Sequence, residues 1–193
     1  MIFLILGALA LGIVVGMFFP FNADLISRIL LLALLFLVGI DVGSNKKTLQ
    51  TFRSYGWSIL LIPFLTILGS LLGGVVVSLL TKHSLVEGVA VAAGMAYYTL
   101  SSIILTQAAG SELGVIAFLS NISREVLTIV LTPALVRLSK LAPVASGGAT
   151  SMDTTLPVIL KYTSKEIGLL SIVSGVVITL LVPVLVSFFA QFL

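Results

Sequence analysis

The sequence lacks cysteine altogether and has few charges, and both shortages narrow the class of protein. With no cysteine among 193 residues, disulfides, thiolate metal sites and cysteine nucleophiles are excluded. Charged residues make up only 9% of the chain, whereas a soluble domain has about 25%. Hydrophobic residues reach 59% and the mean hydropathy is +1.29, so too little polar surface remains to cover a globule in water. We therefore expect an integral membrane protein, with the lipid bilayer as its main solvent.

Basic residues are too few and too scattered for nucleic-acid binding. The formal net charge is only +3, and nucleic-acid recognition needs Lys and Arg gathered on one wet face. Here they stand in short connections between apolar runs, where they orient a membrane protein. A membrane-embedded hydrolase would need a nucleophile with its base, but there is no cysteine and the single histidine, His83, lies in a connection. An enzyme is not expected.

Five apolar segments are long enough to span a membrane, for which about 20 residues are needed. They cover about residues 1–19, 24–42, 57–80, 112–138 and 167–192. The first is interpreted as a retained span, because no basic region opens it and no small-residue cleavage site follows it. Two further stretches, 84–107 and 142–161, are too apolar for exposed loops and too polar for ordinary lipid-facing helices.

Charge placement decides how these two stretches cross. Lys46, Lys47 and Arg53 form the clearest basic connection, which the positive-inside rule places in the cytoplasm. The same rule places the connections after Arg137 and Lys161 in the cytoplasm, so each ambiguous stretch begins and ends on one side. We therefore predict two re-entrant, broken helical hairpins that dip from opposite faces. Two ordinary crossings are the alternative.

An internal repeat supports the re-entrant interpretation. Paired residues recur at one constant spacing: Gly94 with Gly148, Glu112 with Glu166, Gly114 with Gly168, and Ser120 with Ser174. Each copy, about 84–138 and 142–192, has an interrupted stretch followed by one span, so two such copies must be inverted. Inverted repeats with broken helices meeting near the midplane are typical of secondary transporters; chance similarity among small apolar residues is the alternative. The predicted fold is an all-α integral membrane protein, one transmembrane domain over 1–193 with about five transmembrane helices.

Charged residues at bilayer depth cost at least ~2.5 kcal/mol each and are usually retained for function. Arg124 and Glu125 fall inside the fourth span, Asp153 falls at the tip of the second interrupted stretch, and Asp41 lies near an interface. Arg124 could pair with Asp153 across the core, which would leave Glu125 as the titratable site. Two carboxylates and one guanidinium would give a net negative cavity, and that sign suits a cationic substrate.

Asp153 is surrounded by hydroxyl groups and helix breakers. Gly147 and Gly148 precede it and Pro157 follows it, so the chain is expected to unwind there and expose half-helix ends that can bind an ion or an ammonium group. Capping of the following half-helix by the Asp153 carboxylate is the alternative, and hydroxyl groups also serve helix packing in lipid. The candidate substrate- or ion-binding residues are Glu125, Asp153, Thr154, Thr155, Ser101, Ser102, Asn121, Arg124 and Asp41.

Four runs of residues carry a resemblance to a known family. They are GIDVG (39–43), GMAYYTLSS (94–102), SNISRE (120–125) and GGATSMDTTLP (147–157). Together they closely resemble the LysO family of L-lysine exporters, over nearly the whole chain. The resemblance implies export of lysine and its toxic analogues across the cytoplasmic (inner) membrane, and it implies that an acidic pair within the membrane, here Glu125 and Asp153, is needed for transport. Longer members carry about three additional spans before the region matched by Met1, so a homodimer or a partner chain that supplies them is expected.

The predicted function is therefore secondary active export of L-lysine, with proton antiport favoured as the coupling. A sodium-coupled carrier and a carrier of another cationic amino acid are alternatives. A structural or assembly subunit is the alternative from another class, although it would not need intramembrane acids lined by hydroxyl groups. No cofactor is expected beyond a coupling H⁺ or Na⁺, and the expected partners are the amino acid and the lipid bilayer.

Overall fold

Helices form all the regular structure in the part of the chain that can be described. The computed structural model describes residues 59–193, together with the single positions 11, 15, 29, 36 and 40. The chain divides into two compact units, Met1–Leu34 and Leu35–Leu193, and every element below belongs to the second. Within 59–193 no strand occurs. The predicted spans at 1–19 and 24–42, Asp41 and the basic connection around Lys46 lie outside the described residues.

Three long helices have the length and hydropathy of membrane spans. They are α4 (Leu61–Leu80), α7 (Ser111–Leu138) and α10 (Lys165–Ala190). They coincide with the predicted spans at 57–80, 112–138 and 167–192, so these three helices are confirmed. At a rise of 1.5 Å per residue the 28 residues of α7 extend about 42 Å, which exceeds the ~30 Å hydrocarbon core of a bilayer.

Both ambiguous stretches form a pair of short helices separated by a break. The first pair is α5 (Leu85–Ala92) and α6 (Tyr98–Ala109). The second is α8 (Ala142–Gly147) and α9 (Leu156–Tyr162), with the short 3₁₀ helix η2 (Gly148–Met152) following α8 directly. None of these helices is long enough to cross ~30 Å by itself. The prediction of broken helices at these two places is confirmed.

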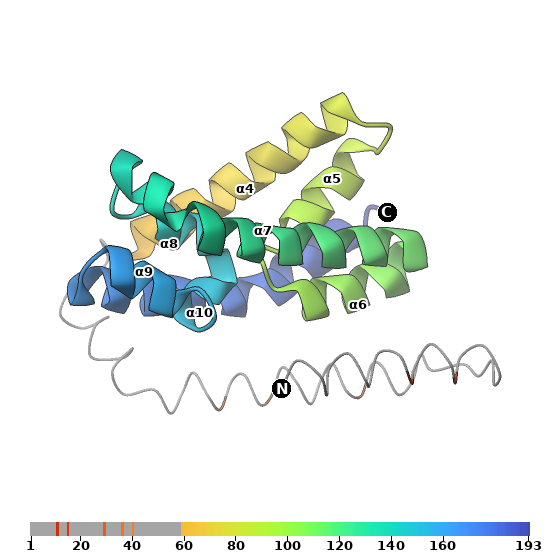
Figure 1. Ribbon diagram of the computed structural model, residues 1–193. Coiled ribbons are helices and arrows are strands. Elements are labelled where there is room, and N and C mark those ends of the chain that lie inside the picture. Colours follow the sequence, from red (N-terminus) through yellow and green to blue (C-terminus); the bar gives the residue numbers. More distant parts are fainter. Residues whose placement is uncertain (1–10, 12–14, 16–28, 30–35, 37–39, 41–58) are drawn as a thin grey trace. The chain divides into compact units, whose positions relative to one another are not determined.

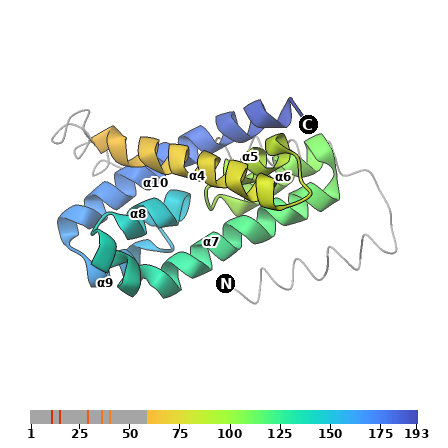
Figure 2. The ribbon, with the colours of Figure 1, turned by 90° about the horizontal axis from the view of Figure 1, so that it is seen from above.

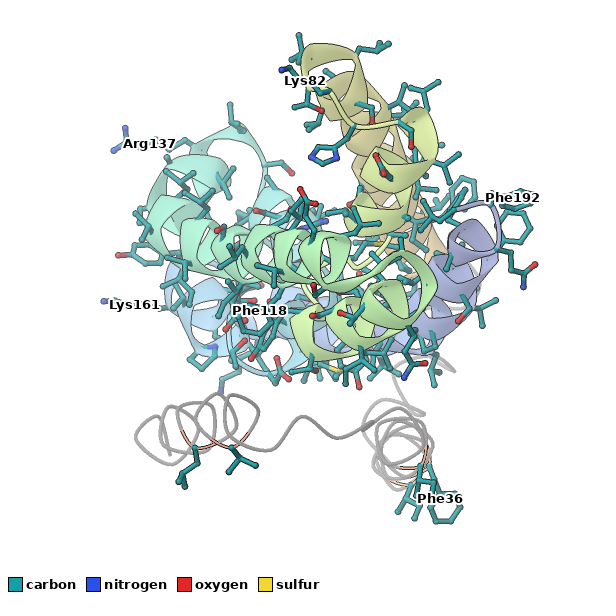
Figure 3. The ribbon with its side chains drawn as sticks, turned by 90° about the vertical axis from the view of Figure 1, so that its right-hand side faces the viewer. Phe36, Lys82, Phe118, Arg137, Lys161 and Phe192 are labelled. Atoms are coloured by element: carbon teal, nitrogen blue, oxygen red, sulfur yellow. The ribbon has the colours of Figure 1, made fainter. Side chains whose placement is uncertain are left out.

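The long helices run back and forth between two ends of this unit (Figure 1). The α4–α5 and α6–α7 connections lie at one end, and the α7–α8 and α9–α10 connections lie at the other; the view from above shows the same order (Figure 2). Each broken pair therefore begins and ends at the same end of the unit. Figure 3 shows Arg137 and Lys161 projecting on one side, apart from Lys82. The basic residues near the α7–α8 and α9–α10 connections are Arg137, Lys140, Lys161 and Lys165.

Short polar signals fix where α5 and α10 begin. Ser84 and Glu87 form a capping box at the start of α5, because the Glu87 N–H donates to the Ser84 hydroxyl at 3.2 Å and the Ser84 N–H donates to the Glu87 carboxylate at 2.8 Å. That second bond holds the pKa of Glu87 below its ordinary value. Ser164 caps α10 by accepting from the Ile167 N–H at 3.4 Å. Gly110 joins α6 to α7 with φ of +92°, which favours glycine.

Small residues on α10 let η2 pack directly against it. A Cβ at Gly175 would meet the Met152 backbone nitrogen at 2.7 Å and the Ala149 carbonyl oxygen at 2.9 Å, so only glycine fits at this approach. Ser171 donates to the Ser151 carbonyl at 2.7 Å, and Ser151 donates in return to the Ser171 carbonyl at 3.1 Å. Close approach at small residues with interhelical hydrogen bonds is how helices associate in lipid. These contacts fix the second break against a long helix.

Candidate functional site

The first break places two buried non-glycine residues in the left-handed region. Met95 has φ of 42° and Ala96 has φ of 72°. Such conformations cost about 1–3 kcal/mol each and persist only where their surroundings hold them. Asn121 on α7 does so here, because the Ala96 N–H donates to its side-chain oxygen at 2.7 Å and its amide donates to the Val91 carbonyl at 3.3 Å. The Asn121 side chain thus bonds both the end of α5 and the residues that lead into α6.

The second break is held by Arg124, one turn further along α7. Its Nε donates to the Ser146 carbonyl at 2.8 Å, one terminal nitrogen donates to the Ala145 carbonyl at 3.0 Å, and the other donates to the Ser70 hydroxyl on α4. The two carbonyls belong to the last residues of α8, where the helix dipole is negative. The predicted pairing of Arg124 with Asp153 is wrong. The guanidinium binds the end of α8 because unpaired carbonyls there lie within its reach.

At the two breaks the backbones meet directly. The Ala149 N–H donates to the Met95 carbonyl at 2.9 Å. Gly148 makes this approach possible, since its φ is +59° and a Cβ on it would collide with the Met95 carbonyl. Backbone N–H and C=O groups freed by a helix break must find partners at membrane depth, where water is absent. The two interrupted stretches therefore satisfy part of each other's backbone.

A cavity of about 260 Å³ lies where the two interrupted stretches face each other. It is slightly smaller than the ~300–1,000 Å³ range of ligand pockets, so it suits a small molecule. Asp153 and Thr154 are exposed, and the Thr154 N–H donates to the Asp153 carboxylate at 2.5 Å. The first residues of α9 receive no side-chain cap, so the capping alternative for Asp153 does not describe its bonds. The cavity is lined by Ala96, Tyr97, Tyr98, Thr99, Ala149, Thr150, Met152, Asp153, Thr154 and Thr179.

Glu125 follows Arg124 on α7 and is half-buried. Its Oε2 atom is buried and has no hydrogen-bond partner among the described residues. Leaving a buried acceptor unsatisfied costs about 1–3 kcal/mol, and more for a charged group. Tyr98, which lines the cavity, lies within electrostatic range of both Glu125 and Asp153. Both predicted acids thus lie within electrostatic range of one cavity residue, Tyr98, while only Asp153 lines the cavity.

The other predicted site residues have different surroundings. Thr155 is fully buried and donates its hydroxyl to the Thr150 carbonyl at 2.9 Å. Ser101 is also fully buried and donates to the Tyr97 carbonyl at 2.9 Å, while Ser102 is half-buried on α6 beside it. Neither Ser101, Ser102 nor Thr155 lines the 260 Å³ cavity. Of the predicted hydroxyl residues, only Thr154 does.

Several cavity residues are absent from the predicted set. Thr179 reaches the cavity from α10, and Tyr97, Tyr98 and Thr150 reach it from the interrupted stretches. A signal for Thr179 was present, because small or hydroxyl residues recur along one face of α10 at helical spacing: Gly168, Ser171, Gly175 and Thr179. The tyrosines stand within a run that resembles the family, but their type suits packing in lipid equally well. Sequence spacing alone does not separate these two roles.

Comparisons with known proteins agree with the resemblance seen in the sequence. A family model described as "Lysine exporter LysO" matches residues 6–190. A curated protein of Escherichia coli named "Lysine exporter LysO" is 33% identical over 189 residues, which are 95% of this chain and 62% of that protein. A protein of Haemophilus influenzae named "Putative lysine exporter" is 34% identical over 194 residues, with 97% of each chain covered. No solved structure matches.

The family match takes in both breaks and the α7 segment that holds them. Residues 6–190 include every described helix. The chain spans less than two thirds of the Escherichia coli relative and almost the full length of the Haemophilus influenzae relative. The chain belongs to the LysO family of lysine exporters.

Proposed function

We propose that this chain is a secondary active exporter of L-lysine and lysine analogues in the cytoplasmic membrane. Membership of the LysO family supports lysine as the substrate. The single observation that carries the site assignment is the 260 Å³ cavity at the meeting of the two interrupted stretches, with Asp153 exposed in its wall. The interrupted stretches are proposed to be re-entrant segments of an inverted repeat, with the cavity near the bilayer midplane.

Charge supports a cationic substrate in this cavity. Asp153 bears a carboxylate whose only hydrogen-bond donors among the described residues belong to Thr154, so it can accept an ammonium group. The positive charge of Arg124 is directed to the α8 carbonyls and does not neutralise Asp153. In our proposal, Asp153 binds a lysine ammonium, and Tyr97 and Thr150, which line the same cavity, hold the polar groups at the other end of the amino acid.

Coupling is proposed to be proton antiport through Glu125 and Asp153. A carboxylate can bind a proton or the lysine ammonium group, but not both at once. If it takes up a proton when lysine leaves, the two are exchanged across the membrane, which is antiport. Glu125 is assigned as the proton-binding group because its Oε2 atom is buried and has no hydrogen-bond partner among the described residues. Alternating access would arise from movement of the two interrupted stretches around the cavity.

Counterflow of radiolabelled lysine in proteoliposomes tests the proposal. Vesicles that contain only the purified chain should exchange lysine, and a pH gradient should drive net flux. Asp153→Asn keeps the size of the side chain and removes the charge, so it should abolish exchange in protein that remains folded. The matched control is Glu112→Gln, which removes an exposed carboxylate at the start of α7 and should leave exchange unchanged. Normal lysine flux in Asp153→Asn would sink the site assignment.

The same vesicles separate the alternatives. Flux that follows a sodium gradient and ignores pH would assign sodium coupling, and competition by ornithine or arginine would measure the choice among cationic amino acids. We also propose that a second copy or a partner chain takes part in transport. The mass of the protein–detergent complex tests for a homodimer. Absence of flux from folded protein would favour the partner chain or the role of an assembly subunit.

A further inference from the structure

The positions of Asn121 and Arg124 on α7 suggest one shared task. They are three residues apart, so they lie on one face of the helix. Both fall near the middle of α7, which runs from Ser111 to Leu138. Asn121 bonds the first break and Arg124 bonds the second. One turn of one long helix therefore holds both interruptions.

Asn121 is buried, and both its amide nitrogen and its amide oxygen already bond within the protein. Its side-chain oxygen accepts from the Ala96 N–H, and its amide nitrogen donates to the carbonyls of Val91 and Ala117 at 3.3 and 2.8 Å and to the Ser101 hydroxyl at 3.4 Å. The side chain is buried, with 3% of its surface exposed. A Cβ at Gly94 would collide with its amide, so the chain is shaped to fit it.

Arg124 is engaged in a similar way. Two of its nitrogens form a fork on the carbonyls of Ala145 and Ser146, and the third bonds Ser70 on α4. One turn later Thr128 donates to the Arg124 carbonyl at 2.8 Å and shares a 2.7 Å bond with the Ser146 hydroxyl. This second link joins the same part of α7 to the end of α8. The planar guanidinium presents two donors side by side and can therefore bind two adjacent carbonyls, whereas the single ammonium group of a lysine cannot match that geometry.

Neither residue lines the cavity that contains Asp153. Both line a different cavity of about 360 Å³ between α4, α5 and α7. No residue belongs to both linings. The two breaks are joined by the bond from the Ala149 N–H to the Met95 carbonyl.

We propose that Asn121 and Arg124 are positioning residues, which fix the crossing of the two interrupted stretches and act on the transported amino acid only through that crossing. Arg124 holds the end of α8, and Gly148 and η2 lead directly from there to Asp153. Asn121 holds the approach to Tyr97 and Tyr98. The two residues thereby set the opposite walls of the cavity. The proposal refines the role of two residues in the export function proposed above and rests on that function for its transport readout.

The rival role for Arg124 is direct binding of the lysine carboxylate, and a substrate lacking that group separates the two. The probe is 1,5-diaminopentane, which is lysine without its carboxylate. Inhibition of lysine counterflow by unlabelled lysine and by 1,5-diaminopentane is measured for the unaltered chain and for Arg124→Gln. A positioning role predicts that both affinities fall by the same factor, roughly tenfold to a hundredfold, as expected when a binding group shifts by about 1 Å. A loss confined to lysine would overturn the proposal.

A spectroscopic readout tests the crossing independently of transport. The chain has no cysteine, so cysteines introduced at the exposed positions Gln107 on α6 and Lys161 on α9 take spin labels without background. Arg124→Gln should broaden the distance distribution between the labels. Arg137→Gln, which removes an exposed arginine from the same helix, should leave it unchanged. An unchanged distribution in Arg124→Gln would refute the positioning role.

The spin-label distances and the transport measurement test different properties of the protein. If the unaltered chain transports no lysine, the proposed function fails while the spin-label distances still decide the positioning role. If Arg124→Gln does not fold, Arg124→Lys replaces it, since it keeps the charge but cannot span two carbonyls in the same way. Arg124→Lys should then broaden the distances and weaken both probes equally, and preservation of both properties would refute the proposal.

Discussion

Substitution of Gly148 by alanine should destabilise the protein strongly, because this residue carries the contact between the two breaks. Gly148 has φ of 59° and ψ of −126°, a combination that costs a residue with a side chain about 1–3 kcal/mol. The new Cβ would also collide with the Met95 carbonyl oxygen and would lie 3.1 Å from the Met95 carbonyl carbon. Both are backbone atoms that cannot rotate away.

Separation of the two backbones would in addition break the bond from the Ala149 N–H to the Met95 carbonyl, which contributes about 0.5–1.5 kcal/mol. The total is about 2–4 kcal/mol. For chains of this size such a loss corresponds to a fall in Tm of roughly 5–15 °C. Thermal unfolding of the purified protein in detergent measures it, with lysine counterflow in parallel, and transport should be lost because the cavity walls separate.

Gly69→Ala is the matched control for Gly148→Ala. Gly69 lies within α4, and a Cβ there would meet no described atom within 4 Å. Alanine is preferred to glycine inside a helix by about 1 kcal/mol, so this variant should be unchanged or more stable. If Gly148→Ala retained the Tm and the transport of the unaltered chain, the backbone contact between the breaks would not be what holds the cavity together.

Three further substitutions test separate parts of the site. Glu125→Met should raise the Tm while abolishing lysine export, because it removes a buried, unpaired carboxylate oxygen whose burial costs about 1–3 kcal/mol; lower stability would show that the carboxylate has partners after all. Thr155→Val should lower stability by about 1 kcal/mol in thermal unfolding, since it removes the hydroxyl bond to the buried Thr150 carbonyl, and the affinity for lysine in counterflow should hardly change. Glu87→Ala should lower stability most at pH 7. The bond from the Ser84 N–H lowers the pKa of Glu87, so the bond stabilises the fold above the ordinary carboxyl pKa and is lost as pH falls through the lowered value; a stability difference that does not shrink as the solution is acidified would contradict this.

Much of the described fold could be predicted because its signals are local. An apolar run of about 20 residues identifies a span wherever it stands, and α4, α7 and α10 coincide with three such runs. Glycine and hydroxyl residues at 94–102 and 147–157 mark the two interruptions for the same reason, since both residue types weaken a helix without any partner. Predictions of this kind do not depend on how distant parts of the chain pack.

Roles within the site could not be predicted, because they depend on contacts between distant segments. The charge of Arg124 suggested a carboxylate partner, yet carbonyl groups at the end of α8 take its donors. Thr154 and Thr155 are adjacent and chemically identical. Thr154 lines the cavity, whereas Thr155 is buried and its hydroxyl donates to the Thr150 backbone carbonyl. Which of them faces the cavity depends on the turn between η2 and α9, and residue type alone carries no information about that turn.

The polar residues in the middle of α7 and the breaks in the neighbouring stretches supply each other's hydrogen-bond partners. A helix interrupted at membrane depth leaves N–H and C=O groups that lipid cannot satisfy, and polar side chains on a spanning helix are equally costly without partners. Asn121, Arg124 and Thr128 meet both requirements at once, since each bonds to the interrupted stretches. Glu125 stands in the same segment and has an oxygen that no described break satisfies. This unsatisfied oxygen is the observation that supports the proposed role of Glu125 in transport, and the Glu125→Met variant tests that role.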